Sequence, residues 1–319
     1  MMPKRFSSDP VSVGSKPDHS NSESPEPQHA SRPAARWGER HPLHDPWILA
    51  HFQARPTDVL ITTAPKAGTT WMQQILHQLL TGGDTDFEDI DQVVPWLERQ
   101  RPPRAWREVL ADFEQRPDPR LFKTHCTWEQ TPGRETARIV LTVRDPRDCC
   151  VSFYHHLMDM SDSALEQDQL ERPPSLDAHV DQWLAFGAWF RNVASWWPQR
   201  QRSNLLMLRY SDLKADLPGA MRRIAGFLGW SLTAEALERA AHYSAFAWMK
   251  AHSERFAGRN ADGTPMFRTG GFIRKGQTGD HKTHLTAEQE AKILRRCRQE
   301  LPPDCLAYLG LPTDGGPAS

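Results

Sequence analysis

The chain has 319 residues, of which 38% are hydrophobic and 25% charged, and its formal net charge is −1. This length suffices for one large domain or two smaller ones, and the balanced charge gives no general reason to expect a nucleic-acid or membrane partner. No apolar run approaches the roughly 20 residues of a membrane span, and none at the start has the length of a signal peptide. We therefore expect a cytoplasmic protein that binds neither nucleic acid nor a membrane.

The composition divides the chain into three parts. Residues 1–40 are rich in Ser, Pro and charged residues, which predicts a disordered tail. We expect one folded domain over residues 41–313 and a flexible tail over residues 314–319. The five cysteines have no metal-ligand spacing and their number is odd, which favours free thiols in a reducing compartment.

The first candidate site lies between a strand and a helix. Residues 58–62 form an apolar run that predicts a buried strand, and a helical pattern begins at Trp71. The segment 63–71 between them reads TAPKAGTTW. A turn that carries Lys66 and Gly68 into a helix presents backbone N–H groups and a cation to one anionic group. On its own, a glycine-containing turn with a solvated lysine is an equally good explanation.

The second candidate site follows a short apolar run. Lys123, Thr124 and His125 come directly after Leu121 and Phe122. A histidine at the end of a strand can serve as a general base near neutral pH, because its reference pKa is about 6.5. A lone histidine is more often structural, and this chain has 14 histidines.

The third candidate site follows the apolar run 138–143. Arg144 opens the segment RDPRD, and Ser152 lies eight residues after it. The guanidinium fork of Arg144 and the hydroxyl of Ser152 could together hold a terminal phosphate. Alternatively, Arg144 caps a helix or pairs with Asp148.

The remaining chain completes an α/β pattern. Residues 205–208 form a third long apolar run, and each such run is followed by helical periodicity. This predicts an α/β fold with a central, mostly parallel sheet flanked by helices, whose motifs meet at the carboxyl ends of the strands. The segments 158–174 and 251–279 have the composition of loops. The second is long enough to be a functional lid, and its Arg274, Lys275 and Gly276 form a flexible cationic clamp.

At these motifs the chain resembles the cytosolic-type sulfotransferases, whose donor is 3'-phosphoadenylyl sulfate (PAPS). The family's loop reads Pro-Lys-Ser/Ala-Gly-Thr-Thr-Trp, its base lies in Lys-Thr-His, and its 3'-phosphate site is Arg-Asn/Asp-Pro/Ala-Lys/Arg-Asp with Ser eight residues on. The resemblance runs from about Trp47 to about Glu290. It implies a single α/β domain with a P-loop-like phosphosulfate-binding loop and a PAPS-dependent sulfotransferase that needs no metal.

The resemblance also implies roles for single residues. It makes His125 the general base, with Lys66 and Lys123 stabilising the transferring group. The positions that match the family's cofactor-binding residues are Lys66, Ala67, Gly68, Thr69, Thr70, Trp71, Arg144, Ser152, Tyr210, Ser244, Phe246, Arg274, Lys275 and Gly276. His281 departs from the family, which usually has Trp there.

The acceptor and the partners are less determined. A small, hydrophobic phenol or alcohol is the expected acceptor, with an amine, a sugar or a bacterial natural product as alternatives. The apolar candidates for its pocket are Phe87, Trp96, Trp128, Met158 and Trp248. A homodimer is compatible with the sequence, but the family's dimer motif is imperfect, since Ala287 replaces Val and Glu290 falls one residue early. An idle nucleotide-binding scaffold and a magnesium-dependent kinase-like enzyme are the competing functions.

Overall fold

The computed structural model describes residues 43–100, 103–260, 262–268 and 272–313. The predictions of a disordered tail over residues 1–40 and a flexible tail over residues 314–319 lie outside these residues. Within the described part of the chain, none of the helices is both long enough and apolar enough to cross a membrane.

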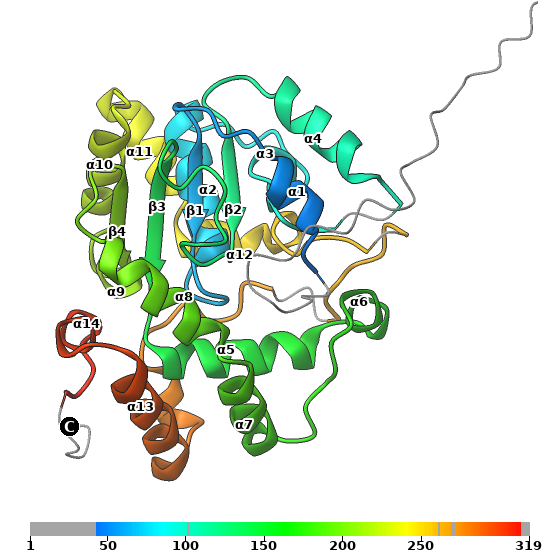
Figure 1. Ribbon diagram of the computed structural model, residues 1–319. Helices are drawn as coiled ribbons and strands as arrows, with labels where there is room; N and C mark the ends of the chain where they lie inside the picture. Colours follow the sequence, from blue (N-terminus) through cyan, green and yellow to red (C-terminus); the bar gives the residue numbers. More distant parts are fainter. Residues whose placement is uncertain (1–42, 101–102, 261, 269–271, 314–319) are drawn as a thin grey trace, which may run out of the picture. The chain divides into compact units, whose positions relative to one another are not determined.

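In the described part of the chain, four parallel strands form one sheet in the order β2-β1-β3-β4 (Figure 1). The strands are β1 (Val59–Thr62), β2 (Leu121–Thr124), β3 (Arg138–Val143) and β4 (Leu205–Arg209). Leu60 of β1 is in register with Phe122 of β2 and Ile139 of β3. The three predicted runs are therefore strands, of which β1 begins one residue later than expected and β4 ends one residue later.

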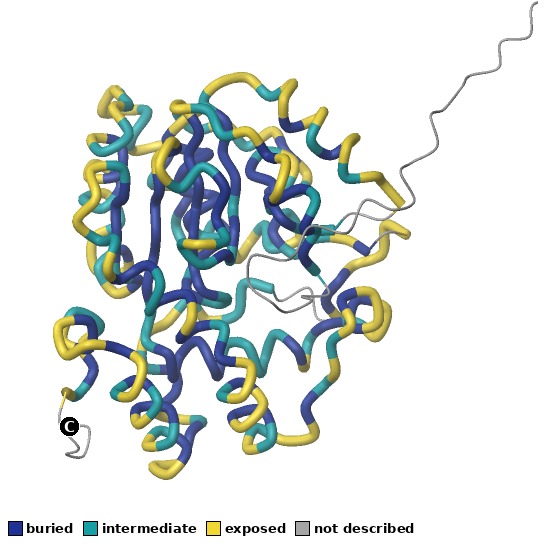
Figure 2. Tube along the Cα trace, in the orientation of Figure 1, coloured by how far each residue is buried: buried dark blue, intermediate teal, exposed yellow. Residues whose placement is uncertain are grey.

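The strands are buried because helices cover both faces of the sheet, as Figure 2 shows by their dark colour. Leu60, Ile139 and Leu141 contribute to one core, and Ile61 and Val140 contribute to the other. The first core includes residues of α5 (Pro146–Asp159), α7 (Leu176–Phe186), α8 (Ala188–Trp196) and α13 (Ala287–Glu300). The second includes residues of α2 (Thr69–Thr81), α9 (Tyr210–Ala215), α10 (Leu217–Leu228) and α11 (Ala234–Tyr243).

Several of the remaining helices add residues to the first core. The α-helices are α1 (Pro46–His51), α3 (Ile90–Val93), α4 (Trp106–Gln115), α6 (Asp162–Asp168), α12 (Phe246–Ala251) and α14 (Pro303–Leu309). The 3₁₀ helices are η1 (Trp197–Gln199), η2 (Ser253–Arg255) and η3 (Asp280–Thr283).

One predicted loop was wrong in part. The segment 158–174 contains α6, where the Ser161 side chain caps the helix by accepting from the backbone N–H of Ala164 at 3.2 Å. Ala164 and Leu165 are buried with Met160 in a small core of their own. In the segment 251–279, the described residues are mostly irregular, as expected, apart from the end of α12 and η2.

A buried ion pair joins the beginnings of β1 and β2. Asp58 and Arg120 are both almost fully buried, and the two guanidinium nitrogens Nε and Nη2 donate to the carboxylate at 2.8 and 2.7 Å. The backbone carbonyls of Gln53 and Phe113 accept two further bonds from Arg120. Such a pair is stabilising only while both partners remain, because either charge alone would be desolvated without compensation.

All five cysteines are free and buried. Burial raises the pKa of each thiol, that of Cys150 and Cys305 to about 12. The prediction of free thiols is confirmed.

Candidate active site

The segment 63–71 is a tight loop between β1 and α2. Gly68 precedes the helix with φ 98°, and a Cβ atom there would lie 2.8 Å from Cδ2 of Tyr210, so glycine is required. Lys66 also has a positive φ, of 67°. A hydrogen bond between the hydroxyls of Thr63 and Thr69 joins the two ends of the loop. Because no side chain caps α2, the N–H groups of its first turn can serve an anionic ligand.

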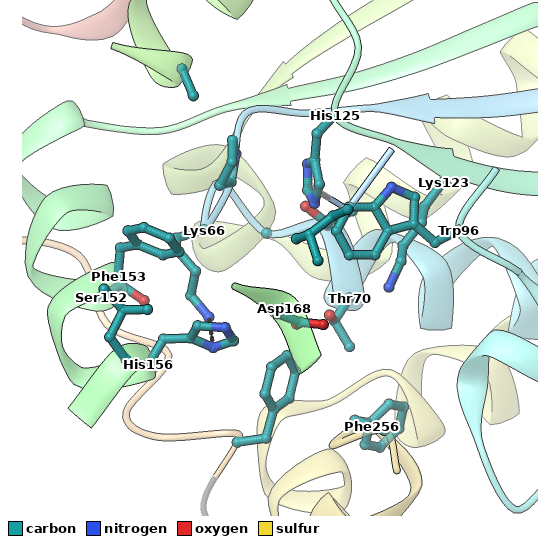
Figure 3. Close-up of a pocket in the computed structure, with 18 of the residues that line it drawn as sticks. Lys66, Thr70, Trp96, Lys123, His125, Ser152, Phe153, His156, Asp168 and Phe256 are labelled. Atoms are coloured by element: carbon teal, nitrogen blue, oxygen red, sulfur yellow. Dashed lines mark hydrogen bonds between the residues drawn. The ribbon is translucent and has the colours of Figure 1, made fainter. Parts of the chain in front are cut away.

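Lys66 points from this loop into the cavity shown in Figure 3. Its Nζ lies 3.2 Å from Nδ1 of His156 and 5.0 Å from the centre of the Phe272 ring. Burial, and next the charge of Arg144, lower the pKa of Lys66 to about 7. An anionic ligand would favour the charged form of this lysine.

His125 follows β2 and is held in one orientation. Its Nδ1 lies 2.7 Å from the carbonyl oxygen of Thr63, which can only accept, so Nδ1 carries the proton and Nε2 keeps the lone pair. The backbone N–H of His125 donates to the buried carboxylate of Glu98 at 2.8 Å. Burial lowers the pKa of His125 to about 4. The rings of Trp96 and His125 lie nearly perpendicular to each other at a centroid distance of 5.0 Å. At neutral pH, His125 is therefore an unprotonated base with Nε2 available.

Lys123 enters the same cavity from β2. Its Nζ forms an ion pair with Asp91 at 3.0 Å and lies 5.2 Å from the centre of the Trp96 ring. An ammonium group has three donors, so Lys123 can contact a ligand while it keeps Asp91.

Arg144 begins the turn after β3 and binds two other segments. Its guanidinium donates to the carbonyls of Lys66 at 3.2 Å and Gln277 at 2.8 Å, and it lies 4.5 Å from the centre of the Tyr210 ring. A weaker ion pair at 3.7 Å joins Arg144 to Asp148, so the pairing that the sequence offered as an alternative is also present. Arg144 thus connects the phosphate loop with the predicted lid.

The two cations of the lid form ion pairs with one carboxylate. Arg274 and Lys275 both bind Asp280, the latter at 2.8 Å. Burial tends to raise the pKa of Asp280, but the hydrogen bonds from these two cations outweigh it and lower the pKa to about 2. Gly276 has φ 57°, and a Cβ atom there would collide with the ring of Phe246. The lid backbone therefore lies directly against that ring.

His281, which departs from the family's Trp, is buried and hydrogen-bonded. Its backbone N–H and Nδ1 lie 3.1 and 2.9 Å from Oδ1 of Asp148. The other oxygen of Asp148 accepts from the N–H of Gly279 at 2.8 Å. Hydrogen bonds to α5 therefore anchor this end of the lid.

Aromatic residues gather beside the phosphate loop. The indole N–H of Trp71 donates to the carbonyl of Ser244 at 2.8 Å, and the ring meets Tyr210 edge-on at 5.3 Å. Lys214 lies 5.5 Å from the centre of the Phe246 ring. The Ser244 hydroxyl is buried and has no hydrogen-bond partner among the described residues. Trp71, Tyr210 and Phe246 line the cavity, and their rings offer the apolar surface that an adenine ring needs.

One cavity of about 1370 Å³ joins these parts. The predicted site residues that line it are Lys66, Gly68, Thr69, Thr70, Trp71, Lys123, His125, Arg144, Ser152, Tyr210, Phe246, Arg274, Lys275 and Gly276. Ala67 and Ser244 are absent from its lining. Among the residues that the structure describes, no cluster of three or more His, Cys, Asp and Glu is placed to hold a metal ion.

The predicted acceptor wall was largely wrong. Of its five apolar candidates, Trp96 lines the large cavity, and Met158 lines a smaller neighbouring one of about 270 Å³. Phe87, Trp128 and Trp248 pack in cores or against other rings instead. The apolar wall is built from residues that the sequence did not single out for this purpose, namely Phe153, Leu157, Phe256, Met266, Phe267 and Phe272.

Sequence reasoning also missed the polar residues that position the site. Glu98 accepts a hydrogen bond from the backbone of His125, and Asp148 accepts one from the backbone of the lid. Asp280 binds the two cations of the lid, and His156 contacts Lys66. Asp148 lies inside the motif RDPRD, which was the available signal. Nothing in the spacing links His156 to Lys66.

A loop with free N–H groups before a helix, a buried histidine with an available lone pair and a pair of cations line one cavity, an arrangement typical of enzymes that transfer a group from a phosphate-containing donor. A family model described as "Sulfotransferase domain" matches residues 56–302. The chain belongs to the sulfotransferase family.

Curated relatives agree with this assignment, and solved structures share the fold. Sulfotransferase 2B1 of Mus musculus is 32% identical over 247 residues, which cover 74% of this chain and 68% of that protein. Sulfotransferase 1B1 of Mus musculus is 31% identical over 251 residues, covering 76% and 81%. The mouse sulfotransferase SULT7A1, complexed with PAP, has a TM-score of 0.66 at 22% identity, covering 85% of this chain and 92% of that one. Retinol dehydratase, in complex with androsterone and PAP, has a TM-score of 0.66 at 23% identity, covering 83% and 84%.

These findings confirm two predictions. The fold is a single α/β domain with a parallel sheet flanked by helices. The protein is a PAPS-dependent sulfotransferase that acts on a small acceptor, and neither competing function is favoured.

Proposed function

We propose that the protein transfers the sulfuryl group of PAPS to a hydroxyl, or an amine, of a small hydrophobic acceptor. The products are a sulfate ester, or a sulfamate, and adenosine 3',5'-bisphosphate (PAP). One observation carries the proposal: Lys66, His125 and Arg144, which follow three different strands, line one cavity. No metal is proposed, because cationic side chains and backbone N–H groups supply the positive charge.

Three groups of residues would hold the donor. The loop 63–71 would take the 5'-phosphosulfate, because its N–H groups and Lys66 face one point. Arg144, Ser152 and the lid residues 274–276 would take the 3'-phosphate. Trp71, Tyr210 and Phe246 would enclose the adenine, with Ser244 behind them holding the indole of Trp71 through its carbonyl. PAP in the SULT7A1 and retinol dehydratase structures supports this donor.

His125 would act as the general base. Its Nε2 accepts the proton of the acceptor hydroxyl while the hydroxyl oxygen bonds to sulfur and the bond between sulfur and the bridging phosphate oxygen breaks. Negative charge then develops on that bridging oxygen, where Lys66 and Lys123 would stabilise it. As in phosphoryl transfer, positioning and electrostatics do most of the work.

The acceptor would lie against the aromatic wall beyond His125. Phe153, Phe267 and Phe272 line this part of the cavity with Trp96, which suits an apolar ring. The buried carboxylate of Asp168 adds a polar group to the lining and forms an ion pair with Arg99. Androsterone in the retinol dehydratase complex supports a hydrophobic acceptor of this kind.

A homodimer that uses the family's motif would have to form with Ala287 in place of the motif's Val and with Glu290 one residue early. Thr286 caps α13, and Glu290 binds Arg147 at 3.0 Å within the chain. Sedimentation at several protein concentrations tests whether the chain is a monomer or a dimer.

The proposed function is tested by sulfate transfer from radiolabelled PAPS to a panel of phenols, steroids, alcohols, amines and sugars. A labelled product formed by the wild type and lost in His125→Ala supports it. PAP binding without any product would favour the idle scaffold. ATP turnover that depends on magnesium would favour the kinase-like enzyme.

A further inference from the structure

His156 contacts the reaction centre without a role in the proposed mechanism. It lies on α5, one helical turn beyond Ser152, and its Nδ1 is 3.2 Å from the Lys66 ammonium (Figure 3). These two residues are 90 positions apart in the sequence. His156 lines the large cavity beside the aromatic wall that we assign to the acceptor.

The surroundings of His156 keep its imidazole neutral. The ring stacks on Phe153 at 5.8 Å and meets Phe267 at 5.0 Å and Phe272 at 6.0 Å. Burial lowers the pKa of His156 well below its usual value, and the charge of Lys66 lowers it further. A neutral imidazole has one donor nitrogen and one acceptor nitrogen.

The contact with Lys66 decides which nitrogen is which. A charged ammonium has donors only, so Nδ1 of His156 must accept and the proton must lie on Nε2. An anionic donor at the phosphate loop keeps Lys66 charged and preserves this tautomer. With three donors, Lys66 can hold His156 and a donor oxygen at the same time.

The Nε2–H group is then a donor at the cavity wall. Nε2 forms no hydrogen bond with any described residue, and protein atoms do not enclose it completely. Figure 3 shows the imidazole reaching into the pocket that also receives His125. A ligand in this part of the cavity would meet one fixed donor among aromatic rings.

Resting on the proposed function, we propose that His156 determines acceptor specificity: its Nε2–H donates a hydrogen bond to a second oxygen of the acceptor. The preferred acceptors are hydroxylated aromatic or polycyclic molecules that carry, apart from the sulfated hydroxyl, a carbonyl, ether or further hydroxyl oxygen. An acceptor without that oxygen would leave the donor buried and unsatisfied.

The tautomer is tested first, by ¹⁵N NMR of the full chain labelled at histidine and saturated with PAP. The signals of His156 are assigned by their absence in His156→Asn. We expect the pyridine-like shift at Nδ1 and the pyrrole-like shift at Nε2. The reverse pattern, or a doubly protonated ring, would overturn the proposal whether or not an acceptor is known.

Specificity is tested with matched phenols that carry either a methoxy or acetyl group or an ethyl or isopropyl group at the same ring position. The wild type should prefer the oxygenated member by about tenfold in kcat/KM, as for one hydrogen bond. His156→Asn keeps an oxygen near the Nδ1 position for Lys66 and should lose this preference while it still sulfates the alkyl phenol. His155→Asn, one residue earlier and outside the lining of the large cavity, is the matched control and should keep the preference.

The two failures are distinct. Wild-type protein that transfers no sulfate to any acceptor would refute the proposed function. Sulfate transfer with the same preference in the wild type and His156→Asn would refute the role of His156 alone. Loss of PAP affinity in His156→Asn, measured by calorimetry, would reassign His156 to donor binding and equally overturn the proposal.

Discussion

Replacement of His125 by Ala should remove most activity and little stability. A positioned general base contributes about 10²- to 10⁴-fold to the rate, and we expect a loss of kcat/KM in that range. Among the described residues, the side chain of His125 forms one hydrogen bond, to the carbonyl of Thr63. The hydrogen bond to Glu98 comes from the backbone N–H of residue 125 and therefore remains in the variant. One hydrogen bond is worth about 1 kcal/mol, so the Tm should fall by only about 2–4 °C.

The pH dependence distinguishes this base from an ordinary histidine. With a pKa of about 4, His125 keeps its lone pair from pH 7 down to pH 5, and the acid limb of kcat/KM should lie near pH 4. A histidine with the reference pKa would instead lose about 25-fold of its basic form over the same interval. Initial rates of sulfate transfer at fixed ionic strength, with stability checked at each pH, give the profile.

Two results would refute the reasoning. Turnover of His125→Ala within threefold of the wild type would remove the base assignment. An acid limb near pH 6.5 would show that the burial of the imidazole does not hold in solution. The Tm of His125→Ala is the control, since a large fall would mean that lost activity reflects lost structure.

Three further expectations concern other parts of the site and the core. The pKa of Lys66 is about 7 in the free protein, so kcat/KM for PAPS should fall as the pH rises above 7, whereas kcat at saturating PAPS should fall only at higher pH; coincident limbs would contradict this. Asp58→Ala leaves Arg120 buried with only the exposed carboxylate of Glu114 as a partner and should lower the unfolding free energy by about 3 kcal/mol, which urea titration measures; a change below 1 kcal/mol would count against the buried pair. Gly276→Ala places a methyl group against an aromatic ring and should weaken PAP binding at least tenfold by calorimetry, while Gly263→Ala, also at positive φ but with open space around it, should not. Equal effects of both substitutions would mean that backbone strain, not the ring contact, is responsible.

The sequence was most informative where local patterns decide the structure. Near-continuous apolar runs gave the buried strands, and β3 has the predicted bounds. The turn at Lys66 and Gly68 was located because its glycine, its cation and the following helix are adjacent in the chain. Helix α6 was missed because only two of its seven residues, Ala164 and Leu165, are apolar, which is too few to show a helical period, and its buried side depends on Met160.

The acceptor wall could not be predicted because aromatic residues serve cores and cavities alike. Phe87 and Trp248 pack in or against a core cluster only, whereas Phe267 and Phe272 pack with core clusters and also line the cavity, and their residue types do not distinguish them. The contact of His156 with Lys66 depends on the path of α5 past the phosphate loop. Such juxtapositions arise only from tertiary packing.

The buried cysteines make this enzyme convenient for optical study. The thiolate is the form that reacts with maleimides, and burial keeps all five native thiols protonated and enclosed. A single cysteine introduced at an exposed position of the lid would therefore be labelled selectively at neutral pH, without first removing the native ones. A fluorophore attached there could report the binding of PAP beside it in real time on an otherwise unaltered chain.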